Sequence, residues 1–174
     1  MHRRQWMAAV AAVGFARVAG SVFAQTPRRP PAQSIDPFVG TWILNLGKST
    51  FENMPSPKSV IRTVDYERDG LVLVTAHTTN TAGVMSFVHY LFTLDGKEYE
   101  EMSRSSGTPG RVPTFMSATK VSDHALKLAF KNGGKVTISH EWTVSDDGKT
   151  WTMKRTASDA QGKRVYSVQV YDKQ

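Results

Sequence analysis

The chain has 174 residues, a formal net charge of +7 and no cysteine. The lack of cysteine excludes a disulfide framework, a thiol nucleophile and cysteine-based zinc or iron–sulfur sites. The excess of positive charge is mild, and no cluster of Lys and Arg is interleaved with aromatic residues, so the sequence does not predict a nucleic-acid-binding protein.

The first 24 residues have the features of an export signal peptide. A basic start precedes the apolar run Met7–Ala16, and Val22-Phe23-Ala24 offers the small residues that a signal peptidase reads. Arg3-Arg4 resembles a twin-arginine signal, so both the general and the twin-arginine routes stay open, and a disordered tail is the alternative. We therefore expect a periplasmic or secreted protein. Ten apolar residues span about 15 Å as a helix, too short for stable membrane insertion.

Residues 25–35 are rich in Pro and Arg and are typical of an extended linker. The remaining stretch, residues 36–174, is long enough for one domain with one core. Its first residues, 36–40, are compatible with a single short helical turn. The sequence therefore predicts three parts: a signal peptide, a linker and one folded domain.

After residue 40 the pattern is almost entirely β, because apolar and β-branched residues alternate with polar ones over short runs. Dipeptides such as Asp95-Gly96 and Asp147-Gly148 separate several runs and favour tight hairpins. The sequence predicts no long helix. In chain order, the expected strands span residues 41–46, 58–67, 71–78, 84–94, 97–102, 112–121, 124–131, 135–145, 149–157 and 163–172.

Short strands joined mainly by tight turns indicate an all-β antiparallel meander. A sheet of this size tends to curl, and closure removes its exposed edges, which favours an up-and-down β-barrel of eight to ten strands. A two-sheet sandwich is the alternative, but immunoglobulin-like sandwiches need longer crossovers than this chain offers. Gly40 lets the chain bend tightly into the first strand, and Trp42 is suited to plug one end of a barrel.

The segment Phe38–Phe51 resembles the opening of the small bacterial lipocalin-like proteins of the calycin superfamily and is similar to the opening of fatty-acid-binding proteins. The Asp-Gly-Lys turns at residues 95–97 and 147–149 and the ending Val170–Gln174 agree with it. The resemblance implies a barrel with a central cavity for a small apolar molecule. Arg164-Val165-Tyr166 resembles the Arg-x-Tyr pair with which fatty-acid-binding proteins hold a carboxylate, and an Arg fork suits that bidentate contact.

Polar residues on apparently inward faces indicate a cavity, because burying them without partners is costly. The alternative for each is a place at the barrel rim or a pairing with a neighbouring strand. The residues expected to bind a ligand are Arg62, His77, Tyr90, His140, Trp142, Arg155, Arg164 and Tyr166.

The sequence predicts no catalytic residue, no metal site and no cofactor. His77, His89, His124 and His140 lack the close spacing of metal ligands, and Ser105-Ser106-Gly107 lacks the Gly-x-Ser-x-Gly elbow of hydrolases. The oligomeric state is not predicted.

Three functions remain. The first is an exported protein that encloses a small apolar or amphipathic molecule. The second is a calycin-type isomerase, cyclase or lyase with a buried His or Arg in the cavity. The third is a structural or interaction domain with a filled barrel. Binding is favoured over catalysis, although the fold by itself does not decide between the three.

Overall fold

A computed structural model describes residues 36–66, 70–100, 102–104, 114–159 and 161–174. The predicted signal peptide and linker lie outside the described residues. Two 3-10 turns, η1 (Asp36–Phe38) and η2 (Leu46–Lys48), flank the first strand. The strands are β1 (Gly40–Leu44), β2 (Thr50–Glu52), β3 (Ser59–Tyr66), β4 (Val72–Thr79), β5 (Met85–Phe92), β6 (Tyr99–Glu100), β7 (Met102–Arg104), β8 (Thr114–Ser122), β9 (Ala125–Asn132), β10 (Lys135–Val144), β11 (Thr150–Ser158) and β12 (Arg164–Lys173). Among the described residues, no helix is long and apolar enough to cross a membrane.

Every predicted strand overlaps a strand of the structure, and η1 occupies the predicted helical turn. Two short elements, η2 and β2, were not predicted from the sequence. The strand predicted at residues 97–102 was also too long, because the structure has only Tyr99–Glu100 there before β7 begins at Met102. These differences fall in segments of two or three residues, which are too short to show an alternating pattern.

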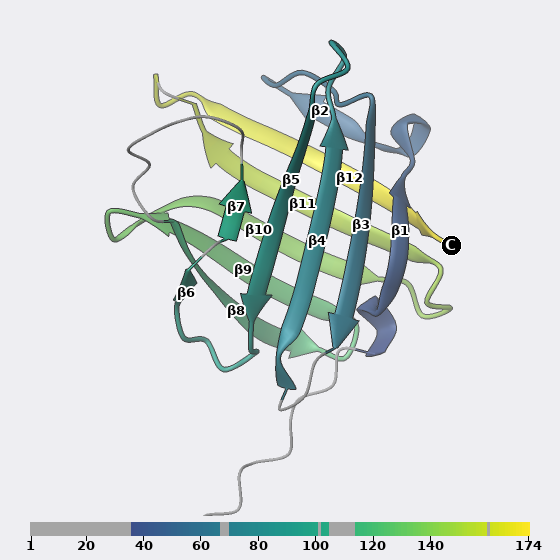
Figure 1. Ribbon diagram of the computed structural model, residues 1–174, viewed down its shortest axis with the longest axis vertical. Helices are drawn as coiled ribbons and strands as arrows, with labels where there is room; N and C mark the ends of the chain where they lie inside the picture. Colours follow the sequence, from purple (N-terminus) through teal and green to yellow (C-terminus); the bar gives the residue numbers. More distant parts are fainter. Residues whose placement is uncertain (1–35, 67–69, 101, 105–113, 160) are drawn as a thin grey trace, which may run out of the picture. The chain divides into compact units, whose positions relative to one another are not determined.

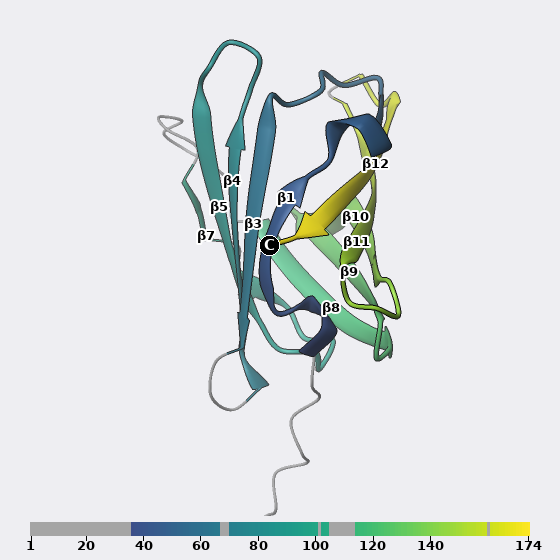
Figure 2. The same ribbon diagram turned by 90° about the vertical axis from the view of Figure 1, so that its right-hand side faces the viewer.

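The strands form one antiparallel sheet in the order β6-β8-β9-β10-β11-β12-β1-β3-β4-β5-β7, with β2 paired to β12. Because β1 pairs with both β12 and β3, the sheet curls into a nearly closed up-and-down barrel, as predicted. The barrel is flattened into two layers, with β3, β4 and β5 on one side and β8 to β12 crossing behind them (Figures 1 and 2). This closure excludes the sandwich alternative.

Gly40 starts β1 with a backbone angle φ of +131°, a conformation that L side chains rarely adopt. A Cβ at this position would lie 2.9 Å from the Cε atom of Lys173, which stands opposite Trp42 on β12. The chain can therefore bend from η1 into the first strand only because this residue has no side chain.

Aromatic side chains plug one end of the barrel. Trp42, Trp142 and Trp151 are fully buried, and the ring of Trp151 lies 5.7 Å from that of Trp42 and 4.7 Å from that of Trp142. Phe38 packs edge-on against Trp151 at 6.1 Å, and its carbonyl oxygen accepts a hydrogen bond of 2.7 Å from the indole N–H of Trp42. The predicted role of Trp42 is confirmed, and this end of the barrel is closed by close packing.

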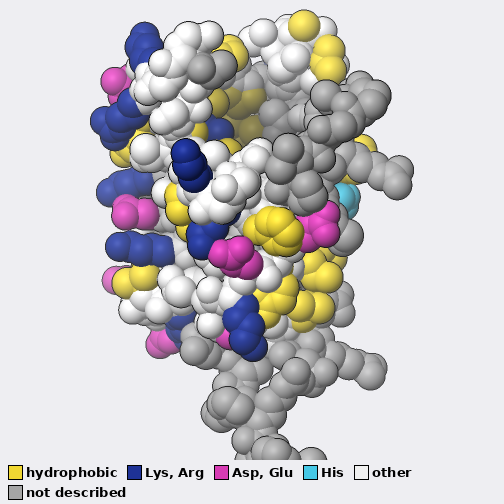
Figure 3. All heavy atoms as spheres, turned by 90° about the vertical axis from the view of Figure 1, so that its left-hand side faces the viewer, with side chains coloured by type: hydrophobic (Ala, Val, Ile, Leu, Met, Phe, Trp, Pro, Cys, Tyr) yellow, Lys and Arg dark blue, Asp and Glu magenta, His cyan; other side chains and the backbone are white. Residues whose placement is uncertain are grey.

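The outer faces of the two layers differ in character. On β9, β10 and β11, Lys127, Glu141 and Lys154 stand side by side in register, and Lys127 and Glu141 lie 3.9 Å apart. On β3, β4 and β5, the corresponding outward row includes Ile61 and Phe87, which are exposed apolar residues. Figure 3 shows charged side chains along one edge and a hollow near the top of the face.

Candidate functional site

A cavity of about 480 Å³ lies inside the barrel, a volume within the usual range for small-molecule sites. Both layers contribute to its wall, and the connections after β2 and β4 contribute to its rim. The lining residues are Phe51, Met54, Pro55, Ser56, Pro57, Val60, Arg62, Thr78, Asn80, Thr81, Val88, Tyr90, Phe130, Ile138, His140, Arg155 and Gln169.

Strand alternation explains why these side chains face inward. On β3, Val60 and Arg62 share a face with the core residue Val64, and on β10 His140 shares a face with Trp142. Because residues two apart point to the same side, each inward row begins in the aromatic plug and ends in the cavity. The plug therefore holds the strands in register at one end while the cavity stays open along the same rows.

Arg62 is the most constrained polar residue of the cavity, with 7% of its surface exposed. Its Nε atom donates a hydrogen bond of 2.9 Å to the hydroxyl of Tyr171, which donates in turn to Oε1 of Gln169 at 2.5 Å. Burial acts to lower the pKa of Arg62, but its interactions with Tyr171 and Tyr90 hold that pKa above the ordinary value. The guanidinium is therefore charged, and its orientation is set by the inner face of β12.

His140 is 4% exposed, and neither ring nitrogen forms a hydrogen bond with any residue that the structure describes. Its ring lies 4.8 Å from that of Phe130 and stacks on Trp142 at 6.4 Å. Burial, followed by the nearby charges of Arg62 and Arg155, lowers its pKa well below the ordinary value of 6.5. The imidazole is therefore neutral at neutral pH, with one nitrogen free to donate and the other free to accept.

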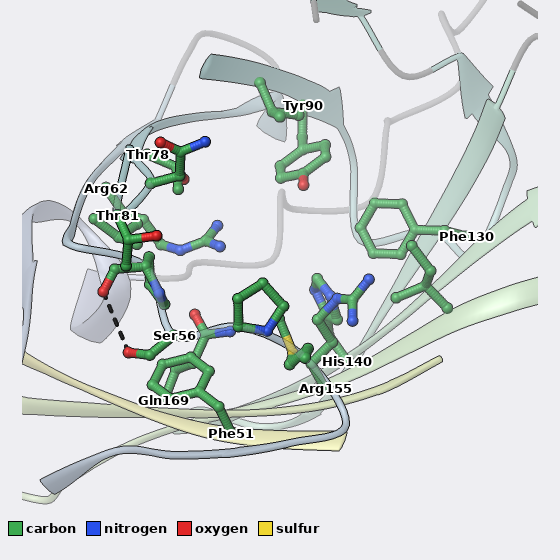
Figure 4. Close-up of a pocket in the computed structure, with 17 residues that line it drawn as sticks. Phe51, Ser56, Arg62, Thr78, Thr81, Tyr90, Phe130, His140, Arg155 and Gln169 are labelled. Carbon is green, nitrogen blue, oxygen red and sulfur yellow. Dashed lines mark hydrogen bonds between the residues drawn. The ribbon is translucent and has the colours of Figure 1, made fainter. Parts of the chain in front are cut away.

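Arg155 enters the cavity from β11 and stands in register opposite His140. Burial, together with the charge of Arg62, lowers the pKa of Arg155 from its ordinary value, yet a guanidinium stays charged in proteins. Figure 4 shows the four residues directed into one space, Arg62 and Tyr90 from the layer of β3 to β5 and His140 and Arg155 from the other layer. The described lining contains no Asp or Glu, so this space is electropositive.

Four of the eight predicted ligand-binding residues line the cavity: Arg62, Tyr90, His140 and Arg155. Trp142 does not line it. It lies one step deeper in the aromatic plug, where it supports the ring of His140.

The other three predicted residues are on the outside of the barrel, so their predicted inward orientation is wrong. His77 is exposed on the outer face of β4, where its ring lies 6.3 Å from that of Phe87. Arg164 and Tyr166 alternate with the buried residues of β12, and the guanidinium of Arg164 lies 4.6 Å from the ring of Tyr166. On β4 and on β12, each residue that was predicted to face inward lies next to a residue that does, and adjacent residues of a strand point to opposite faces.

Sequence reasoning missed Gln169 and Tyr171, which carry the hydrogen-bond chain from Arg62. They lie on the same face of β12 as Val165 and Ser167, and all four residues are buried. The sequence shows that β12 alternates between two faces. However, the face with Val, Ser, Gln and Tyr is no more apolar than the opposite face of the same strand. Only the fold decides which of two mixed faces is inside.

The described residues contain no group of three or more His, Asp or Glu placed to hold a metal ion. The side chains that line the cavity offer two positive charges, a neutral imidazole, the phenol of Tyr90 and a largely apolar wall. Such a site can orient an amphipathic molecule with its negative end toward the arginines.

No protein-family model matches the chain, and no curated protein matches it. Among similar solved structures is that of the wild-type fluorescent protein UnaG, which is 17% identical with a TM-score of 0.51 over 81% of this chain and 100% of UnaG. A point mutant of UnaG is 16% identical, with a TM-score of 0.55 over 81% of this chain and 99% of that one. Rv2717c from M. tuberculosis is 11% identical, with a TM-score of 0.54 over 84% of this chain and 98% of that one. These likenesses show a calycin-like fold, as the opening residues predicted.

Proposed function

We propose that this protein is an exported binding protein that encloses a small amphipathic molecule, with its negatively charged end at Arg62 and Arg155. One observation carries the proposal: two guanidinium groups face a mainly apolar cavity whose described lining has no acidic residue. Buried charges in proteins are normally paired, because an isolated charge loses the solvation of water. A ligand anion supplies the missing partner.

The apolar part of the ligand has a matching surface. Phe51, Val60, Val88, Phe130 and Ile138 contribute side chains from five different strands to the wall. An alkyl or aromatic body placed among them is removed from water, which stabilises the complex by about 25 cal/mol for each Å² of apolar surface buried. The volume of the cavity also argues against the filled-barrel hypothesis, which needs an interior without room for a ligand.

A fluorescence titration with decanoate tests the proposal, because Trp142 stacks on the cavity residue His140. We expect saturable binding to the wild-type protein. Arg155→Met removes one charged donor and is expected to weaken binding by about tenfold or more, as expected for the loss of a charge-assisted hydrogen bond.

The matched control is Arg164→Met, the same substitution on the outer face of β12. We expect it to leave decanoate affinity unchanged. Equal weakening by both variants, or no saturable binding of decanoate to the wild-type protein, would contradict the proposed function.

Catalysis is the second candidate, and the environment of His140 favours it. A buried, neutral imidazole without a described hydrogen-bond partner is suited to take or give a proton inside an apolar cavity. Mass spectrometry of a bound ligand after long incubation distinguishes the two functions. A chemically altered ligand, with the alteration lost in His140→Ala, would favour the enzyme over the binding protein.

A further inference from the structure

Charge balance in the cavity indicates more than a single negative charge on the ligand. Arg62 and Arg155 bring two positive charges, and neither forms an ion pair with an acidic residue in the described part of the chain. The partners of Arg62 are the phenols of Tyr171 and Tyr90, and neither is an acidic residue. A ligand with one negative charge would therefore leave one guanidinium uncompensated in an apolar setting.

Hydrogen-bonding atoms without a described partner in the same space also favour an anionic ligand. Nη1 of Arg62 and both ring nitrogens of His140 have no partner among the described residues, although both side chains are more than nine-tenths buried. Buried polar atoms are almost always hydrogen-bonded in folded proteins. A tetrahedral anion with three terminal oxygens offers an acceptor to each of Arg62, Arg155 and His140.

The size of the cavity limits the rest of the molecule. Its volume of about 480 Å³ equals that of roughly 16 water molecules at about 30 Å³ each. A phosphate group with a chain of about ten carbon atoms fits such a space.

We propose that the ligand carries a doubly negative head group of the phosphate monoester type on a single apolar body of medium length. This inference rests on the proposed function and names the chemical class of its ligand. Arg62 and Arg155 neutralise the two charges, and His140 donates a hydrogen bond to a third oxygen. The phenols of Tyr90 and Tyr171 keep Arg62 in place.

The test compares three probes with the same chain: decyl phosphate, decyl sulfate and decanol. Phosphate and sulfate esters have the same tetrahedral shape, but at pH 8 the phosphate monoester carries two negative charges, because its second pKa is near 6. We expect calorimetric titration below the micelle-forming concentrations to show decyl phosphate binding about tenfold or more tighter than decyl sulfate, and decanol binding weakest.

Variants test whether the preference for decyl phosphate over decyl sulfate arises in the cavity. In Arg155→Met the advantage of phosphate over sulfate is expected to fall to about threefold or less, because one positive charge is gone. Arg155→Lys keeps the charge and is expected to keep most of the advantage. Arg164→Met, on the outer face, is expected to behave like the wild-type protein. Circular dichroism confirms that each variant is folded.

The outcomes separate this inference from the proposed function. Equal affinities for decyl phosphate and decyl sulfate would overturn the doubly charged ligand and leave amphipathic binding intact. A phosphate preference that survives unchanged in Arg155→Met would also overturn it, because the second charge would then be bound elsewhere. Binding of none of the three probes, together with no binding of decanoate, would overturn both.

Discussion

His140 occupies an environment that opposes its protonation. Its imidazole is buried between Phe130 and Trp142, and the nearby arginines add positive charge. The folded state therefore keeps His140 neutral under conditions in which the unfolded chain protonates it.

This difference predicts how stability depends on pH. The folded-state pKa of His140 lies below the unfolded value near 6.5, so below that pH the unfolded chain binds a proton that the folded protein does not. As the pH is lowered below about 6.5, the free energy of unfolding is therefore expected to decrease. The decrease is up to about 1.4 kcal/mol for each pH unit, until the folded-state pKa is reached. Urea unfolding at pH 7.5 and at pH 5.5 measures the change.

The comparison variant for this experiment is His140→Gln, which is expected to lose much less stability between the two pH values. His77→Gln provides the matched control, because that imidazole is exposed on the outer face of β4. If the wild-type protein and His140→Gln showed the same dependence on pH, the burial of a neutral His140 would be refuted.

At the scale of the residue, the sequence predicted chemistry better than orientation. Arg62, Tyr90, His140 and Arg155 were correctly placed in the cavity, because each shares its inward row with apolar core residues. On β12 both faces contain polar and apolar residues. Arg164 and Tyr166 were therefore predicted to face the cavity, whereas Gln169 and Tyr171 were missed. A shift of one position exchanges the two faces of a strand.

At the scale of the element, the strands and their turns followed from local pattern. The runs around β9, β10 and β11 alternate clearly, and the turn at Gly148 has the positive φ of 68° that its Asp-Gly dipeptide predicts. The short elements β2, β6 and β7 depend on neighbours that are distant in the sequence. β2, for instance, exists as a strand because it pairs with Tyr166–Val168 of β12.

Gly40 offers a test at this scale. Gly40→Ala places a methyl group in a backbone conformation unfavourable to L residues and within 2.9 Å of the Cε atom of Lys173. We expect a loss of about 1–3 kcal/mol in the free energy of unfolding. In the control Gly47→Ala, the new Cβ would meet Oδ1 of Asn45 at an ordinary 3.5 Å, and a change within about 0.5 kcal/mol is expected. Similar losses in both variants would argue against strain at Gly40.

At the scale of the whole molecule, closure joins the first and last long strands. β1 pairs with β12 on one side and β3 on the other, so the interior forms only when the two ends of the barrel sequence meet. The cavity and its charges are consequences of that closure, because Arg62 on β3 reaches Tyr171 on β12 across β1.

Export concerns the whole chain and remains a proposal that rests on residues 1–24. Cleavage after Ala24 is expected, so that the mature protein in its compartment starts at Gln25. Mass spectrometry of the N-terminal peptide measures this directly. Replacement of Arg3 and Arg4 by Lys is expected to block export only if the twin-arginine route is used, whereas an uncleaved Met1 in the mature protein would contradict export by either route.

The sequence by itself determined the all-β class, the long strands, the tight turns and the antiparallel meander that closes into a barrel, because these depend on alternation and turn residues that are adjacent in the chain. It also placed Trp42 in the plug. Only the tertiary structure decided which face of each mixed strand is inside, and that the interior is open. Those outcomes depend on side chains from distant strands, such as Arg62, His140 and Arg155, meeting around one space when the sheet curls.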